Sequence, residues 1–166
     1  MFQEEKHYEQ VLNLNEVFHR RPQALAILQG SRDYPEIRGT VRFFQTGHGV
    51  IVAAEVMGLP MTGESCQGDF FGFHIHEGKS CTGNAEMPFS NALGHYNPDG
   101  CEHPYHAGDL PPLLGNRGYA ISVFLTDRFS VREIMGRTVI VHGSADDFRT
   151  QPSGNAGTMI ACGVVR

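Results

Sequence analysis

Short β-forming runs recur along this chain of 166 residues, and no helical pattern alternates with them. The 20 glycines and 9 prolines are too frequent for a helical bundle, because both residue types interrupt helices. The runs that we expect to form strands cover residues 23–29, 34–45, 50–56, 70–76, 119–125, 138–142 and 158–165. Several short strands without intervening helices predict an all-β fold, an antiparallel sandwich or barrel.

The first 21 residues differ from the rest. Their apolar residues recur at roughly helical intervals among polar ones, at Tyr8, Val11, Leu12, Leu14 and Val17, and predict a short helix that ends before Pro22. We therefore expect an N-terminal extension, residues 1–21, and one β domain, residues 22–166. The apolar side of the extension could pack on the barrel or on another subunit, so a homodimer is one option and the oligomeric state stays open.

Charge and hydropathy exclude several partners. The formal net charge of −5 argues against nucleic acid, which selects basic surfaces. No run reaches the roughly 18 apolar residues of a membrane span, so we expect no membrane partner. The N-terminus lacks a basic start followed by an apolar stretch, which predicts a cytoplasmic protein. Four cysteines favour an oxidising compartment instead, so an exported protein whose signal was removed is the alternative.

Six of the nine histidines fall at spacings that suit metal binding. His74 and His76 stand at i and i+2 of an expected strand, so their imidazoles share a face. Further potential ligands follow at His95, His103, His106, Asp109 and His142. Imidazole suits copper and zinc, and three imidazoles with one carboxylate suit tetrahedral zinc. If His95 is shared, six histidines and one aspartate satisfy two four-coordinate metals. Several of these residues lie in about forty irregular residues between His76 and Gly118, a loop length that usually indicates function.

Six segments resemble the copper/zinc superoxide dismutases, in particular the bacterial ones. They are GFHIHEG at 72–78, HYNP at 95–98, HAGDLP at 106–111, GRTVIVH at 136–142, GNAG at 154–157 and ACGV at 161–164. They follow the order of the family, and the resemblance runs from about residue 23 to the end. It implies a Greek-key antiparallel β-barrel of the immunoglobulin-like sandwich type. It also implies dismutation of superoxide to dioxygen and hydrogen peroxide by redox cycling of copper beside zinc.

The resemblance assigns roles to the potential ligands. It implies that copper is bound by His74, His76, His95 and His142, and zinc by His95, His103, His106 and Asp109. His95 then bridges the two metals and supplies a proton to the peroxide product. Asp146 matches an aspartate that hydrogen-bonds ligand histidines of both metals, although an aspartate in a loop is often only a turn former.

The resemblance also implies a disulfide between Cys81 and Cys162, which ties a loop of the metal site to the barrel. Cys66 and Cys101 are then left over. Three alternatives remain for them: a second disulfide, two free thiols, or coordination of a metal by the Cys101 thiolate.

Two departures from the family pattern bear on activity. His103 and His106 are separated by only two residues, so the loop that carries them, called the zinc loop below, is short. The family usually places an arginine beside copper, where it guides superoxide, and this chain has Met159 there. Arg149 could substitute for that arginine or be a solvated loop residue, and Met159 could contact copper or only pack. The sequence therefore predicts an enzyme, whose rate these departures could reduce, with a metal-binding protein of little or no activity as the alternative.

Overall fold

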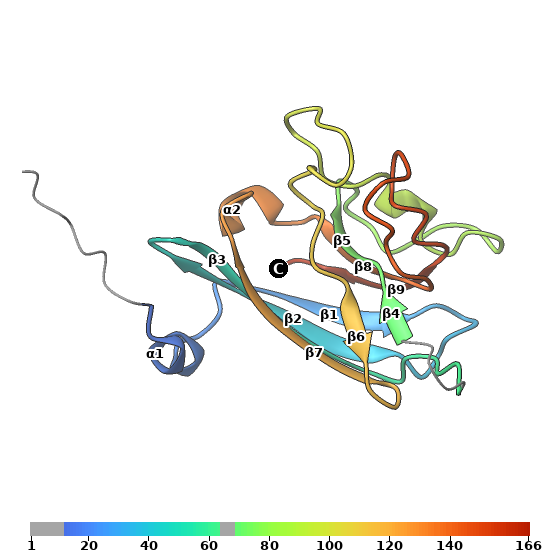
Figure 1. Ribbon diagram of the computed structural model, residues 1–166, viewed down its shortest axis with the longest axis horizontal. Coiled ribbons are helices and arrows are strands. Elements are labelled where there is room, and N and C mark those ends of the chain that lie inside the picture. Colours follow the sequence, from blue (N-terminus) through green and yellow to red (C-terminus); the bar gives the residue numbers. More distant parts are fainter. Residues whose placement is uncertain (1–11, 64–68) are drawn as a thin grey trace, which may run out of the picture.

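The computed structural model describes residues 12–63 and 69–166 (Figure 1). These residues contain nine strands: β1 Ala24–Gly30, β2 Arg38–Thr46, β3 Gly49–Met57, β4 Asp69–Phe71, β5 Phe73–His76, β6 Leu113–Gly115, β7 Tyr119–Thr126, β8 Thr138–His142 and β9 Met159–Val164. The helical elements are short: α1 Leu14–His19, η1 Ser90–Ala92 and α2 Val131–Ile134. The expected all-β class is confirmed.

Seven strands form one antiparallel sheet in the order β5-β8-β9-β1-β2-β3-β7, and β4 pairs with β6 in a second, two-stranded sheet. The large sheet is strongly curled (Figure 1). Its edge strand β5 follows β4 across Gly72, and its other edge strand, β7, follows β6 through a tight turn closed by the bridge between Asn116 and Tyr119. The small sheet thus joins the two edges of the large one, which completes a barrel.

Alternating residues of the strands fill the barrel. Ile37, Val41 and Phe43 are buried in one cluster with Phe73 and Ile75 of β5. Burial of such side chains contributes roughly 1.5–3 kcal/mol each. Because Phe73 and Ile75 point inward, the intervening His74 and the following His76 point to the outer face of β5.

Two predicted strands differ from the observed ones by more than a shift of one residue at an end. The run expected at 34–45 begins only at Arg38, because Tyr34 and Ile37 form backbone turns to Ser31 and Tyr34 instead of pairing with a strand. The run expected at 70–76 is divided at Gly72. There the Gly72 N–H donates to Ser144 O at 2.7 Å and its carbonyl accepts from the His142 N–H at 2.8 Å, so the residue leaves the strand ladder.

The N-terminal extension contains a helix, as predicted, and the helix packs on the barrel. Asn13 caps α1, because its side chain accepts from the N–H groups of Asn15 and Glu16. Val17 is buried against Phe44 of β2 and Ile51 of β3 on the outer face of the sheet. Tyr8 and Val11 lie outside the described residues, and the domain boundary at residue 22 stays a prediction. Among the described residues, no helix has the length and hydropathy that a bilayer span needs.

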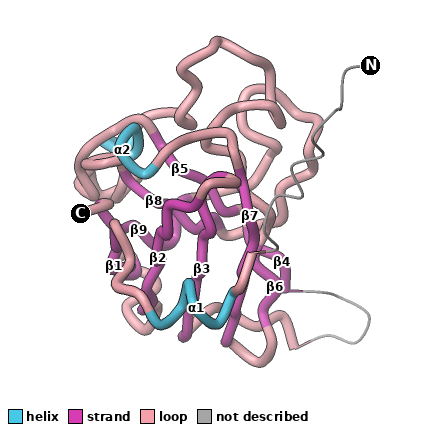
Figure 2. Tube along the Cα trace, turned by 90° about the vertical axis from the view of Figure 1, so that its left-hand side faces the viewer, coloured by secondary structure: helices cyan, strands magenta, loops and turns pink. Residues whose placement is uncertain are grey.

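The long loops gather on the opposite side of the molecule from α1 (Figures 1 and 2). They connect β5 to β6 and β8 to β9, and they lie over the outer face of β5 and β8. The predicted metal ligands belong to these strands and loops, so the fold brings them to one side of the barrel.

Candidate metal centre

Strands β5 and β8 supply the first three histidines. The two strands pair with His74 opposite Ile140 and His76 opposite Thr138, and His142 ends β8. All three histidines are buried, with at most 4% of their surface exposed. The two strands thereby present three imidazoles side by side beneath the loops.

The loop after β5 returns along the free edge of that strand. The N–H of Tyr96 donates to Ile75 O at 2.8 Å, and the N–H of Ile75 donates to Gly108 O at 2.9 Å. Bridges therefore form between His76 and His95 and between His74 and Asp109. Glycine is required at 108, because a Cβ there would lie 2.2 Å from the carbonyl oxygen of Ile75. Backbone pairing thus places the loop ligands beside the strand ligands.

Two groups of four potential metal ligands result, and each has its ligand atoms within 4.8 Å of one another. The first group is His74, His76, His95 and His142, and the second is His95, His103, His106 and Asp109. Every member is buried. His95 belongs to both groups, as the sequence predicted.

Hydrogen bonds orient the imidazoles of the first group. Nε2 of His74 lies 2.7 Å from Oδ2 of Asp146, Nδ1 of His76 lies 2.7 Å from Leu93 O, and Nδ1 of His142 lies 3.1 Å from Gly157 O. Each of these oxygens lies outside the ligand groups, so the ring nitrogen that faces it carries the proton and the other nitrogen has a lone pair. The nitrogens left for a metal are Nδ1 of His74 and Nε2 of His76 and His142.

The second group is arranged around Asp109. Its Oδ1 lies 2.7 Å from Nδ1 of His95, and its Oδ2 lies 3.0 Å from Nδ1 of His103 and 3.3 Å from Nδ1 of His106. The same nitrogen of all three histidines therefore faces one carboxylate. Three imidazoles and one carboxylate at this spacing form the donor set of a tetrahedral zinc site.

Three buried nitrogens in these groups make no hydrogen bond: Nδ1 of His74, Nε2 of His95, and Nδ1 of His103, which lies 3.0 Å from Oδ2 of Asp109 without forming one. Leaving a buried polar atom unpaired costs about 1–3 kcal/mol. Each of these atoms belongs to a ligand group, so metal ions would satisfy all three. The residues therefore fit the copper and zinc that the sequence predicted.

The comparisons with known proteins decide the family. Residues 37–165 match the family described as copper/zinc superoxide dismutase. The chain belongs to this family. It is 34% identical over 146 residues to superoxide dismutase [Cu-Zn] 2 of Aquifex aeolicus, a match that covers 79% of this chain and 80% of that protein. It is 32% identical over 148 residues to superoxide dismutase [Cu-Zn] of Deinococcus radiodurans, covering 78% of this chain and 77% of that protein.

A solved structure is similar as well. The crystal structure of a double mutant of a SOD-like protein from Bacillus subtilis superposes with a TM-score of 0.68 at 29% sequence identity, and the match covers 84% of this chain and 95% of that one. The superoxide dismutase fold and the resemblance noted in the sequence are confirmed together.

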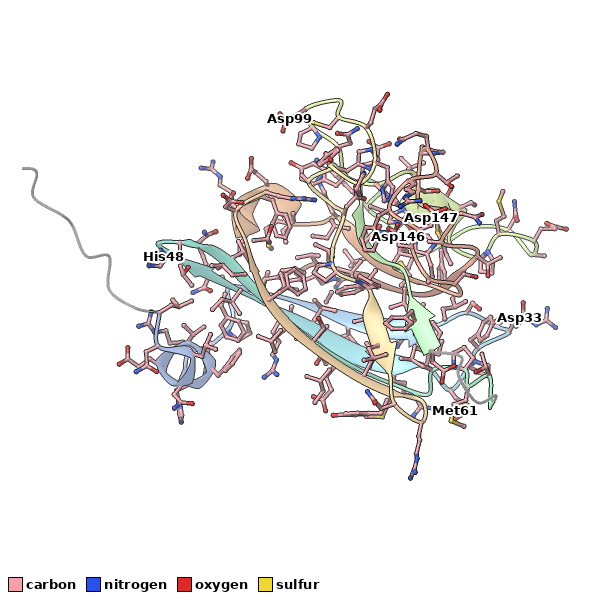
Figure 3. All side chains as sticks on the ribbon, in the orientation of Figure 1. Asp33, His48, Met61, Asp99, Asp146 and Asp147 are labelled. Atoms are coloured by element: carbon pink, nitrogen blue, oxygen red, sulfur yellow. A yellow bond between two sulfur atoms is a disulfide. The ribbon has the colours of Figure 1, made fainter. Side chains whose placement is uncertain are left out.

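Asp146 connects the two ligand groups of this site. Figure 3 shows Asp146 beside Asp147 among the loops. Oδ2 of Asp146 contacts His74, and its Oδ1 lies 2.9 Å from Nε2 of His103 and accepts from the Phe148 N–H at 2.7 Å. Burial raises the pKa of Asp146, but the hydrogen bonds from His74, Phe148 and His103 outweigh burial and hold the pKa below its ordinary value. Asp146 is therefore ionised, and it contacts one histidine of each group as expected.

The strand histidines are neutral at neutral pH. Burial lowers the pKa of His142 to about 3, with His74 adding to the effect, and burial also lowers the pKa of His76 well below its ordinary value. Metal binding requires the neutral imidazole. Folding therefore prepares these nitrogens for a metal without competition from protons.

The disulfide between Cys81 and Cys162 is confirmed, with an S–S distance of 2.04 Å. It fastens the loop after β5 to β9, and Phe89 and Ala92 of that loop pack on Ile140 beside it. Cys101 is free and exposed, and neither ligand group contains a cysteine among the described residues. Cys66 lies outside the described residues, but the free thiol of Cys101 contradicts the predicted disulfide between Cys66 and Cys101.

A cavity of about 420 Å³ opens at the first ligand group, called the copper-type group below, whereas the second group is the zinc-type group. The cavity is lined by His76, His95, His142, Glu77 and Met159 among others. No arginine or lysine is among the described residues of its lining. Met159 also packs partly buried against the cluster around Ile140. Arg149 is exposed and outside this lining, while its backbone N–H donates to Oδ1 of Asp147 at 2.9 Å. The guiding role of Arg149 stays a prediction.

Sequence reasoning missed the backbone contacts of the site. The carbonyls of Leu93 and Gly157 orient two histidines, and the side chains of Gln151 and Arg128 bind the backbone of the zinc loop. Every residue has a carbonyl, so no sequence signal distinguishes these. The proximity of Gln151 to Asp146 in one loop was the only available indication for that residue.

Proposed function

We propose that the protein dismutates superoxide, converting two superoxide ions and two protons into dioxygen and hydrogen peroxide. Copper would be bound by His74, His76, His95 and His142, and zinc by His95, His103, His106 and Asp109. The observation that carries the proposal is the pair of buried ligand groups that share His95. When bound, copper supplies reversible one-electron transfer, which zinc lacks.

His95 is suited to handle a proton in this reaction. Its Nδ1 faces Oδ1 of Asp109, while its Nε2 is buried without a partner and belongs to the copper-type group. An imidazole nitrogen can carry either a proton or a metal ion. Nε2 can therefore hold a proton next to the cavity and release it to the peroxide product, while Nδ1 stays directed into the group that contains Asp109.

The cavity determines how superoxide reaches the site. It admits a small anion, but Glu77 is in its lining and no cation is among the described lining residues. The chain also carries a net charge of −5. Charge focusing by a cation can raise association rates about 10- to 1000-fold, so we expect capture of superoxide to be slower than in a site with an arginine.

A metal-binding role with little or no activity is the second candidate. Met159 in the cavity lining favours it. One relative, 34% identical over 113 residues and matched across 59% of this chain and 56% of its own length, is named superoxide dismutase-like protein YojM of Bacillus subtilis. That name differs from the name superoxide dismutase of the other relatives. The similarity of this chain to proteins of both names therefore supports both candidate functions.

Metal content and activity of the same sample distinguish the candidates. The protein is loaded with zinc and then copper, both metals are quantified, and superoxide decay is followed after pulse radiolysis. Accelerated decay at one copper and one zinc per chain supports the enzyme. Full metal content without acceleration identifies a metal-binding protein, and failure to bind two metals refutes the proposed site.

A further inference from the structure

The short zinc loop is held from outside by a glutamine side chain. The backbone N–H of His103 donates to Oε1 of Gln151 at 2.9 Å, and Nε2 of Gln151 donates to His103 O at 2.7 Å. Both bonds are partly buried. One amide side chain thus pairs with both backbone polar groups of a single zinc-type ligand, as a neighbouring strand would.

The ring of the same histidine is held by the same loop. Gln151 follows Asp146 in the loop between β8 and β9, and Oδ1 of Asp146 lies 2.9 Å from Nε2 of His103. Gly154 packs closely on this contact, because a Cβ there would lie 2.0 Å from Oδ1 of Asp146 and 2.7 Å from Nε2 of His103. The backbone and the ring of His103 are therefore fixed by one piece of chain.

That piece of chain is held together by its own bonds. Asp147 accepts from the backbone N–H groups of Arg149 and Thr150, and the Gly154 N–H donates to Thr150 O at 2.7 Å, so backbone bonds hold the loop. The loop also lines the copper-type cavity through Pro152 and Ser153. It can therefore act as a firm support for the zinc loop.

We propose that Gln151 is a positioning residue for zinc, which holds His103 in its ligand position through the two-way bond to the His103 backbone. This inference rests on the proposed metal site. An amide is required because it offers one donor and one acceptor at once, whereas a carboxylate offers only acceptors. Without the bond, zinc binding itself must order the zinc loop. Part of the binding free energy then offsets the entropy lost by the loop, and the zinc affinity falls. Loss of contacts that orient metal ligands typically weakens binding about 10- to 100-fold.

The test uses zinc affinity of the full chain, measured by competition with a chromophoric chelator in the absence of copper. Gln151→Met keeps the length of the side chain and loses both bonds, so we expect about tenfold weaker zinc binding or more. Gln151→Glu keeps the acceptor for the His103 N–H and is expected to lose less. Thr150→Ala is the matched control, since it removes a hydroxyl bond inside the same loop without touching the zinc loop.

Two further measurements separate positioning from general stability. The visible spectrum of Co²⁺ at the zinc site reports ligand geometry, and we expect Gln151→Met to change it and Thr150→Ala to leave it unchanged. Urea unfolding of each metal-free variant measures stability alone. Equal zinc affinity in Gln151→Met and the wild type, or an equal loss in Thr150→Ala, would overturn the inference. A wild-type protein that binds no zinc would instead refute the proposed function.

Discussion

Removal of the disulfide between Cys81 and Cys162 should destabilise the metal-free protein strongly. The bridge closes a loop with a sequence separation of 81 residues. In the chain-entropy relation, a loop of this length restricts the unfolded state by about 15 cal/mol/K, or about 4.5 kcal/mol at 25 °C. Cys162 is also buried with Phe89 and Ile140, so replacement by alanine removes sulfur contacts and costs about 1 kcal/mol more.

The variants Cys81→Ala, Cys162→Ala and the double variant should be compared with the oxidised wild type by urea unfolding in the presence of a chelator. Each single variant loses the whole bridge, so the losses should be far from additive, and the double variant should resemble Cys162→Ala. Cys101→Ala is the control, because it removes an exposed free thiol and should change the unfolding free energy by less than about 0.5 kcal/mol. A double variant within about 1 kcal/mol of the wild type would refute the argument.

Three other perturbations test other parts of the structure. Gly108→Ala should lower the free energy of unfolding, measured in urea, by about 1–3 kcal/mol or more, because its Cβ would lie 2.2 Å from Ile75 O. An unchanged free energy of unfolding would contradict the close approach of the loop to β5. In metal-free protein, stability should be greatest above pH 6.5 and fall as the pH is lowered toward about 3, because the unfolded chain binds a proton that buried His142 resists. His142 alone contributes a slope of up to about 1.4 kcal/mol per pH unit, and urea titrations without such a slope would argue against its burial. Met159→Arg should raise the rate of superoxide decay about tenfold at low salt and make it decrease with ionic strength, and a rate independent of salt would exclude a guiding effect.

The sequence predicted the ligands well because strand geometry and spacing constrain them. His74 and His76 share the outer face of β5 since alternate residues of a strand point to the same side, and their neighbours Phe73 and Ile75 are buried inside. Donor chemistry alone suggested a zinc set among His95, His103, His106 and Asp109, but the irregular loop carries no periodicity that would place them, so the assignment of each residue to a metal depended on the family resemblance. The disulfide between Cys81 and Cys162 was likewise available only from that resemblance.

Features that depend on contacts between distant loops were not predictable. The division of the fourth predicted strand at Gly72 follows from backbone bonds to Ser144 and His142, more than sixty residues away in the chain. The pairing of Gln151 with His103 and the reach of Arg128 to Pro104 O, at 3.0 Å, also join segments that only the fold brings together. Local sequence determines which residues can form a strand, while these bonds depend on the final packing.

The pairing of the loop after β5 with the free edge of that strand also protects the molecule from aggregation. β5 is at the edge of the seven-stranded sheet, and Tyr96 and Gly108 occupy the backbone groups of Ile75 that would otherwise be unpaired. An uncovered edge strand is a template for a strand from another molecule. Because the same loop supplies His95 and Asp109 and is fastened through Cys81, loss of metal or of the disulfide would loosen the cover of this edge. Metal binding and oxidation would then determine solubility as well as chemistry.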